Sequence, residues 1–102
     1  MKQLTIIVKP FRAEAVLQAI REAEVTACVV REAKGYSRQK GYLDRYASSE
    51  YSLAFLPKVE ITIWIDDDAA ASISERLVNI ARTGRIGDGK VFQVPAVLVL
   101  EF

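Results

Sequence analysis

The most regular alternation in the chain is Lys58-Val59-Glu60-Ile61-Thr62-Ile63-Trp64-Ile65. Successive side chains of a strand point to opposite faces, so this pattern predicts a β-strand with one buried face. The aliphatic residues form that face, and Lys58, Glu60, Thr62 and Trp64 form the other. We expect Trp64 to be covered by another subunit or by a ligand, because a large aromatic surface favours burial.

The residues after this strand predict a second helix and a last strand. Asp66-Asp67-Asp68 suit the positive start of a helix, where one of them is expected to cap the first turn; an acidic metal site is the weaker alternative. Gly84 is expected to end the helix, and Val91 to Leu100 forms the last strand, in which Pro95 indicates an edge or a bulge. The apolar stripe of this helix consists of Ile73, Leu77, Ile80 and Ala81.

The residues before the central strand predict a strand, a helix and another strand. Leu4, Ile6 and Val8 mark the first strand, and Pro10 suits the first turn of a helix, where its missing N–H is not needed. The second strand runs from about Cys28 to Ala33. Between them, apolar residues at helical spacing are Ala13, Val16, Leu17 and Ile20.

The element order is therefore β-α-β, a long loop, then β-α-β. Two βαβ halves predict an α+β fold, a ferredoxin-like βαββαβ sandwich with both helices on one face of a four-stranded antiparallel sheet. The 102 residues are enough for one domain, residues 1–102. Because the helices cover only one face, oligomerisation is the simplest way to cover the other.

Composition and charge exclude several classes of protein. The net charge of +1 argues against a nucleic-acid binder that neutralises many phosphates. The chain has no histidine, the usual general base and metal ligand, and its one cysteine, Cys28, forms no internal disulfide and is expected to be a buried, inert thiol. No segment resembles a signal peptide or a membrane span, so we expect a cytoplasmic protein that is peripheral to a membrane at most.

Two segments do not follow these periodicities. Lys34 to Leu56 is rich in glycine, serine, tyrosine and charge, and a loop of this length in a compact domain is often functional; a tolerated insertion is the alternative. Gly84 to Lys90 matches the first seven positions of a P-loop, G-x-x-x-x-G-K. That match fails because the segment runs from helix to strand and Val91 replaces the hydroxyl residue. A glycine-rich phosphate cradle and an ordinary turn both remain open.

Several blocks together resemble the PII family of nitrogen-signalling proteins over nearly the whole chain. The blocks are Ile7-Val8-Lys9-Pro10-Phe11, Lys34-Gly35-Tyr36-Ser37-Arg38-Gln39-Lys40-Gly41, Glu50-Tyr51, Phe55-Leu56-Pro57-Lys58-Val59 and Thr83-Gly84-Arg85-Ile86-Gly87-Asp88-Gly89-Lys90. The resemblance implies a homotrimer with inward-facing sheets. It also implies nucleotide sites between subunits for ATP or ADP, and a long T-loop, about residues 36–56, that docks on a target transporter or enzyme.

The resemblance also assigns residues to ligands. In the nucleotide site, Asp88 and Lys90 belong to the motif that holds the phosphates, and Arg38 reaches them. The full set is Gly35, Ser37, Arg38, Gln39, Trp64, Gly87, Asp88, Gly89 and Lys90. Gln39 also matches a magnesium ligand, as suits a hard cation that prefers oxygen. The 2-oxoglutarate site comprises Gln39, Lys40, Gly41 and Lys58, and Tyr51 and Ser49 match positions that are modified in some members.

The sequence departs from the family pattern at several positions. Glu101 stands where a phosphate-binding arginine is usual, Val29 cannot donate a hydroxyl hydrogen bond near the adenine, and Ala47 replaces the arginine that some members insert into an ammonium channel. Three functions follow as alternatives: a PII-like nitrogen regulator, a divergent regulator of a bicarbonate or metal transporter that senses ADP or AMP, and a structural trimer that binds nothing. No catalytic constellation is recognisable, so we do not expect an enzyme.

Overall fold

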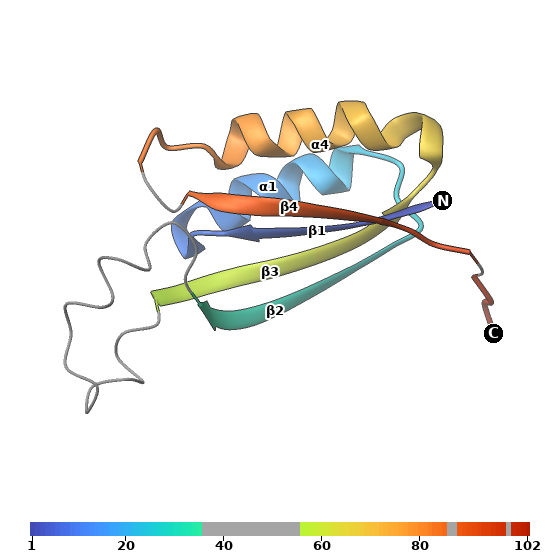
Figure 1. Ribbon diagram of the computed structural model, residues 1–102, viewed down its shortest axis with the longest axis horizontal. Coiled ribbons are helices and arrows are strands. Elements are labelled where there is room, and N and C mark those ends of the chain that lie inside the picture. The colour runs from blue at the N-terminus through green and yellow to red at the C-terminus, as the bar shows by residue number, and fades with distance from the viewer. Residues whose placement is uncertain (36–55, 86–87, 98) are drawn as a thin grey trace.

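The computed structural model describes residues 1–35, 56–85, 88–97 and 99–102. Its elements are β1 (Lys2–Val8), α1 (Pro10–Glu22), β2 (Ala27–Gly35), β3 (Leu56–Ile65), α4 (Asp67–Ala81) and β4 (Gly89–Pro95). The strands form one sheet in the order β2-β3-β1-β4, and every neighbouring pair is antiparallel. Both helices lie on one face of this sheet (Figure 1). The predicted α+β, ferredoxin-like arrangement is confirmed.

The core lies between the two helices and the central strands β1 and β3. The alternation that opened the sequence is confirmed, because Ile61, Ile63 and Ile65 have no exposed surface. Burying one such side chain contributes about 1.5–3 kcal/mol. The other core residues are Leu4, Ile6 and Val8 of β1, Val16, Ala19 and Ile20 of α1, and Ala70, Leu77 and Ala81 of α4.

The opposite face of the sheet carries polar residues at its centre and apolar ones at its β4 edge. Thr5 and Thr62 share a hydrogen bond of 3.0 Å between their hydroxyls, across neighbouring strands. Phe92 and Val94 of β4 are about half exposed and lie on the same face of the sheet as Thr5. Trp64 is partly buried there. This face is therefore the one that the two helices leave uncovered.

The ends of α4 differ from the prediction. Asp66 occupies the N-cap position, but its side chain makes no capping hydrogen bond, so the predicted cap is wrong; its backbone carbonyl accepts the Ala69 N–H instead. At the other end, the helix ends at Ala81 and Arg82 is already extended. Gly84, with φ of 84°, lies beyond the end of the helix, so it shapes the following turn and not the helix terminus.

Two further expectations about the strands were wrong. β4 ends at Pro95, where the ring removes a ladder donor, and not at Leu100. Cys28 is exposed, because it lies on β2, an edge strand, whereas the helices pack mainly on β1, β3 and β4. Even so, partial burial raises the pKa of the Cys28 thiol above its ordinary value.

Candidate functional site

The sheet register brings four segment ends together at one end of the sheet. Val8, the last residue of β1, faces Val59 of β3 on one side and Gly89 of β4 on the other. Gly35, the last residue of β2, faces Leu56 at the start of β3. Figure 1 shows this end of the sheet on the left, where α4 leads into β4. Val8 and Gly89, which are 81 positions apart in sequence, are therefore neighbours here.

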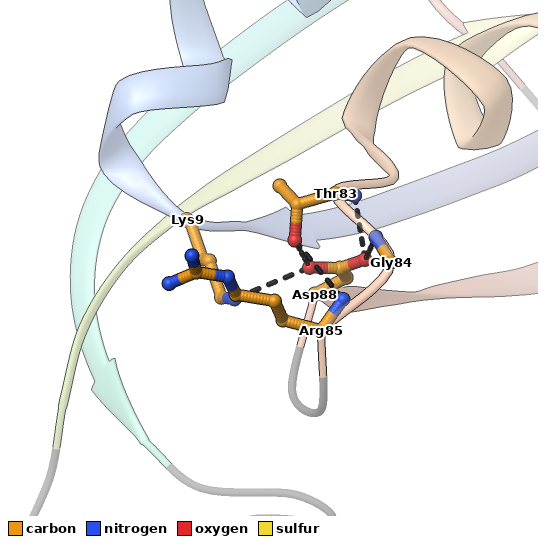
Figure 2. Close-up of polar contacts among 5 residues, drawn as sticks. All are labelled: Lys9, Thr83, Gly84, Arg85 and Asp88. Carbon is orange, nitrogen blue, oxygen red and sulfur yellow. Dashed lines mark hydrogen bonds and ion pairs between the residues drawn. The ribbon is translucent and has the colours of Figure 1, made fainter.

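Asp88 lies at the centre of this end (Figure 2). One carboxylate oxygen accepts the backbone N–H groups of Thr83 and Gly84, at 2.6 and 2.9 Å. The other accepts the Thr83 hydroxyl and the Lys9 ammonium, whose Nζ lies at 3.2 Å. The backbone N–H of Arg85 in turn donates to the Thr83 hydroxyl at 3.3 Å. Asp88 thus makes hydrogen bonds within the turn after α4 and, through Lys9, links that turn to the end of β1.

These donors determine the ionisation of Asp88. The Thr83 hydroxyl, followed by the Thr83 N–H, Lys9 and the Gly84 N–H, holds the pKa of the Asp88 carboxyl far below its ordinary value of 3.8. Desolvation opposes this shift but is outweighed. The Lys9 and Asp88 side chains are only 17% and 18% exposed, so water screens their ion pair less than it screens a surface pair. Asp88 is therefore a permanent anion at neutral pH.

Lys9 is held in place by its position between a strand and a helix. The residue before a proline is restricted to extended backbone, and Lys9 has φ of −64° and ψ of 143° before Pro10. Its carbonyl accepts the Arg12 N–H at 3.0 Å and so begins α1. The dipeptide Lys9-Pro10 therefore ends the strand, starts the helix and fixes the base of the lysine side chain.

Lys58 lies next to this pair. Antiparallel strands run in opposite directions, so one step beyond the Val8–Val59 pair Lys9 follows on one strand and Lys58 on the other. Lys58 is 7% exposed. Burial, and then the positive charge of Lys9, lower the pKa of the Lys58 ammonium, whereas the negative charge of Asp88 opposes this. Two cations and one anion thus share a poorly hydrated corner.

Gly89 is needed here for a structural reason. Its φ is 153°, and a Cβ at this position would lie 2.1 Å from the carbonyl oxygen of Ile7. Any larger residue would therefore push β4 away from β1. By contrast, a Cβ on Gly35 would meet no atom within 4 Å. Glycine is therefore required at position 89 because β4 and β1 pack closely there. The next residue, Lys90, is exposed on β4 opposite Ile7.

The structure brings together only part of the predicted site. Asp88, Gly89, Lys90, Lys58 and Gly35 all lie at the same end of the sheet. Trp64 faces Gln3 and Ala27, six residues along β3 from Lys58, so within one chain it lies about 20 Å from this end. The predicted site residues that lie outside the described part of the chain are Ser37, Arg38, Gln39, Lys40, Gly41, Ser49, Tyr51 and Gly87.

Two residues of this cluster, Lys9 and Thr83, were not assigned a role from the sequence. Both stand in blocks that carry the family resemblance, but no local pattern links Lys9 to Asp88, which is 79 positions away. A lysine before proline and a threonine before glycine are common in turns. The register of β1 against β4 brings Lys9 to the Asp88 carboxylate, and the turn after α4 brings Thr83 to it.

Neither a metal cluster nor a membrane span is found in the described residues. Residues 1–35, 56–85, 88–97 and 99–102 contain no group of three histidine, cysteine or acidic side chains that is placed to hold a metal ion. Asp66, Asp67 and Asp68 thus do not form the alternative metal site. Among the helices in the described part of the chain, none is long and apolar enough to cross a membrane.

Comparison with known proteins identifies relatives of the chain. The sequence model of the family described as nitrogen regulatory protein P-II matches residues 1–100. The chain is 46% identical over 92 residues to a nitrogen regulatory protein P-II of Mesorhizobium japonicum, and 44% identical to one of Rhizobium meliloti. It is 42% identical to nitrogen regulatory protein P-II 1 of Escherichia coli. Each alignment covers 90% of this chain and 82% of the relative.

Proposed function

This chain belongs to the nitrogen regulatory protein P-II family, and from that premise we propose that it is a non-catalytic, cytoplasmic regulator that binds adenine nucleotides. In this proposal residues 1–102 form a single domain, and ATP or ADP binds at the end of the sheet that carries Asp88 and Lys90. Ligand occupancy then biases the conformation of the T-loop, which a target protein reads. This is linkage between two sites and requires no chemistry on the ligand.

The observation that carries the proposal is the convergence of cations and glycines at one end of the sheet. Lys90 is exposed beside Gly89, which has no side chain to hinder a phosphate. Lys9 and Lys58 add two positive charges, against the single carboxylate of Asp88. A local excess of positive charge attracts a polyphosphate even when the whole chain carries a net charge of only +1. The same end leads through Gly35 and Leu56 into residues 36–55.

The C-terminal departure from the family pattern does not remove this charge within one chain. β4 ends at Pro95, which faces Lys2 at the far end of β1, and the chain continues from there to Glu101. Figure 1 shows the C-terminus at that far end. Within one chain Glu101 therefore does not neutralise Lys90. We expect nucleotide binding to survive, with a weaker affinity because the arginine is absent.

The uncovered sheet face supports the proposed homotrimer. Val29, Phe92 and Val94 are exposed on the sheet, and Trp64 is partly buried on the same face. Contact between such faces of three subunits would remove apolar surface from water. It would also provide the cover that Trp64 was expected to need, and it would let Trp64 of one subunit line a site on another.

The other ligands are finer parts of the same proposal. Lys58, which is nearly buried, supplies the cation for a carboxylate of 2-oxoglutarate. Gln39, Lys40 and Gly41 complete that site, and the Gln39 amide oxygen provides one ligand for magnesium bound to ATP, a suitable donor for a hard cation. Arg38 reaches the phosphates, and Tyr51 and Ser49 are the positions for covalent modification.

Calorimetry tests the proposal directly. The full chain is titrated with ATP, ADP and AMP, and ATP is titrated again with magnesium and 2-oxoglutarate. Lys90→Gln should weaken ATP binding by about tenfold or more, because a hydrogen bond to a charged group contributes about 1.5–3 kcal/mol. Lys2→Gln is the matched control, since it removes the same charge at the opposite end of β1. Its affinity for ATP should equal that of the unchanged protein.

The outcomes separate the alternatives. Absence of heat with all three nucleotides would leave the structural trimer as the better interpretation. Binding of ADP or AMP in preference to ATP would favour the divergent transporter regulator over the nitrogen sensor. Equal losses of affinity in Lys90→Gln and Lys2→Gln would mean that the nucleotide binds elsewhere.

A further inference from the structure

Lys9 and Lys58 form a pair of adjacent cations whose surroundings are unusual for lysine. Lys58 is 7% exposed and the Lys9 side chain 17% exposed, although lysine is among the residues least often buried. Burial disfavours the charged form of Lys58, and the positive charge of Lys9 adds like-charge repulsion. A nearby anion offsets part of this unfavourable environment.

The structure provides that anion within the chain. The Asp88 carboxylate lies 3.2 Å from Lys9 Nζ, and its negative charge also stabilises the protonated form of Lys58. Asp88 does not depend on Lys9 for its position, because Thr83 and Gly84 hold both carboxylate oxygens through three hydrogen bonds. Among the residues that the structure describes, its contact with Lys9 is therefore one bond of four, and the only one made outside the turn.

We propose that Asp88 is an internal counter-ion that a carboxylate ligand displaces from Lys9 when it binds between Lys9 and Lys58. The inference rests on the proposed function and describes the regulation of the same site. Asp88 competes with the ligand's negative charge for Lys9, and so lowers the ligand's affinity. In the process, the turn of residues 83–85 loses its only polar side-chain link to the end of β1 among the described residues.

In this proposal the turn has two states, which differ in whether Lys9 contacts Asp88 or the ligand. Without the ligand, Lys9 ties the Asp88 turn to β1 and α1. With the ligand, Lys9 turns to the new carboxylate, and Asp88 keeps its bonds to Thr83 and Gly84. The turn leads directly into Gly89 and Lys90. Occupancy of the lysine pair is thus transmitted to the residues expected to hold phosphate.

The test is a double-substitution cycle with 2-oxoglutarate as the probe, titrated with and without magnesium and ATP. Asp88→Asn keeps an oxygen that accepts the Thr83 and Gly84 N–H groups but removes the competing charge, so it should tighten 2-oxoglutarate binding by about three- to tenfold. Lys9→Gln should weaken binding. In the Lys9→Gln background the effect of Asp88→Asn should fall to about twofold or less, because the two residues act as a pair. Asp67→Asn, which removes an aspartate at the other end of β1, should change nothing.

The results decide the inference separately from the proposed function. Unchanged or weaker binding in Asp88→Asn, or no 2-oxoglutarate binding by either protein, overturns the counter-ion role even where ATP binds normally. Tighter binding in Asp88→Asn supports it even where ATP does not bind. If Asp88→Asn does not fold, NMR titration of the unchanged protein decides. The Asp88 carboxyl carbon and the Lys9 ammonium should shift together with 2-oxoglutarate, and a carboxyl signal that does not move contradicts displacement.

Discussion

Two aspartates hold the two ends of β1, and they differ in almost every other respect. Asp67 accepts the terminal ammonium of Met1 at 3.0 Å, and its side chain is 61% exposed. Asp88 accepts Lys9 at 3.2 Å, with a side chain that is 18% exposed and three further donors from the turn. Both carboxyl groups have a lowered pKa. An ion pair alone therefore does not indicate a functional site. What distinguishes Asp88 from Asp67 is the number of donors that converge on its carboxylate and its low exposure to water.

Gly89→Ala should show the largest effect, because it disturbs the Asp88 end of β1 through the backbone. Its Cβ would lie 2.1 Å from the Ile7 carbonyl oxygen, and φ of 153° is unfavourable for alanine. We expect a loss of about 2 kcal/mol or more in the free energy of unfolding, measured by urea denaturation. Gly35→Ala is the matched control, since its Cβ meets nothing within 4 Å, and it should change stability by less than about 0.5 kcal/mol. Equal losses in both variants would contradict the packing argument.

Replacing each aspartate by alanine compares the two ends directly. Asp88→Ala leaves the partly buried Thr83 N–H and Lys9 without their acceptor, and unsatisfied buried donors are costly. Asp67→Ala exposes groups that water already reaches. The urea midpoint should therefore fall clearly for Asp88→Ala and little for Asp67→Ala. A larger fall for Asp67→Ala would reverse the comparison.

The sequence predicted the strands and their buried faces better than it predicted the side-chain contacts around Asp88. The alternation from Val59 to Ile65 fixes a strand and its buried face, because burial of every second residue leaves a pattern in the sequence. The Asp88 cluster leaves no such pattern, since Lys9 is brought to it by the register of β1 against β4. The exposure of Cys28 depends likewise on where the helices lie over the sheet. Residues 84–90 could be identified as a special turn, but the partners of Asp88 could not.

The pH dependence of stability should also differ between the Asp88 and Asp67 ends of β1, but by less than the effect of the alanine substitutions. The folded-state pKa of Asp88 lies below the ordinary value of 3.8, so the unfolded chain binds the proton more tightly. The stability from Asp88 is therefore fully present above pH 3.8 and is lost as the pH falls through the folded-state pKa. In Asp88→Asn the unfolding midpoint should vary less with pH below about 4 than in the unchanged protein. Asp67→Asn should flatten this dependence less; if it flattens it more, the ranking of the two carboxylates is wrong.

Acetylation of the Met1 amine should have the smallest effect, because it tests the weaker end alone. The modification removes the positive charge that Asp67 accepts at 3.0 Å, but the exposed carboxylate keeps Lys2 at 3.9 Å and is reached by water. Exposed ion pairs contribute little, and salt screens them further. Acetylated and free protein should therefore have the same urea midpoint within error in 0.5 M salt, where the Debye length is about 4 Å. At low salt the protein with the free amine should have a slightly higher urea midpoint than the acetylated protein. A large fall in the urea midpoint of the acetylated protein at high salt would contradict this, because it would mean that the exposed ion pair of Met1 stabilises the fold as much as the Lys9–Asp88 pair does.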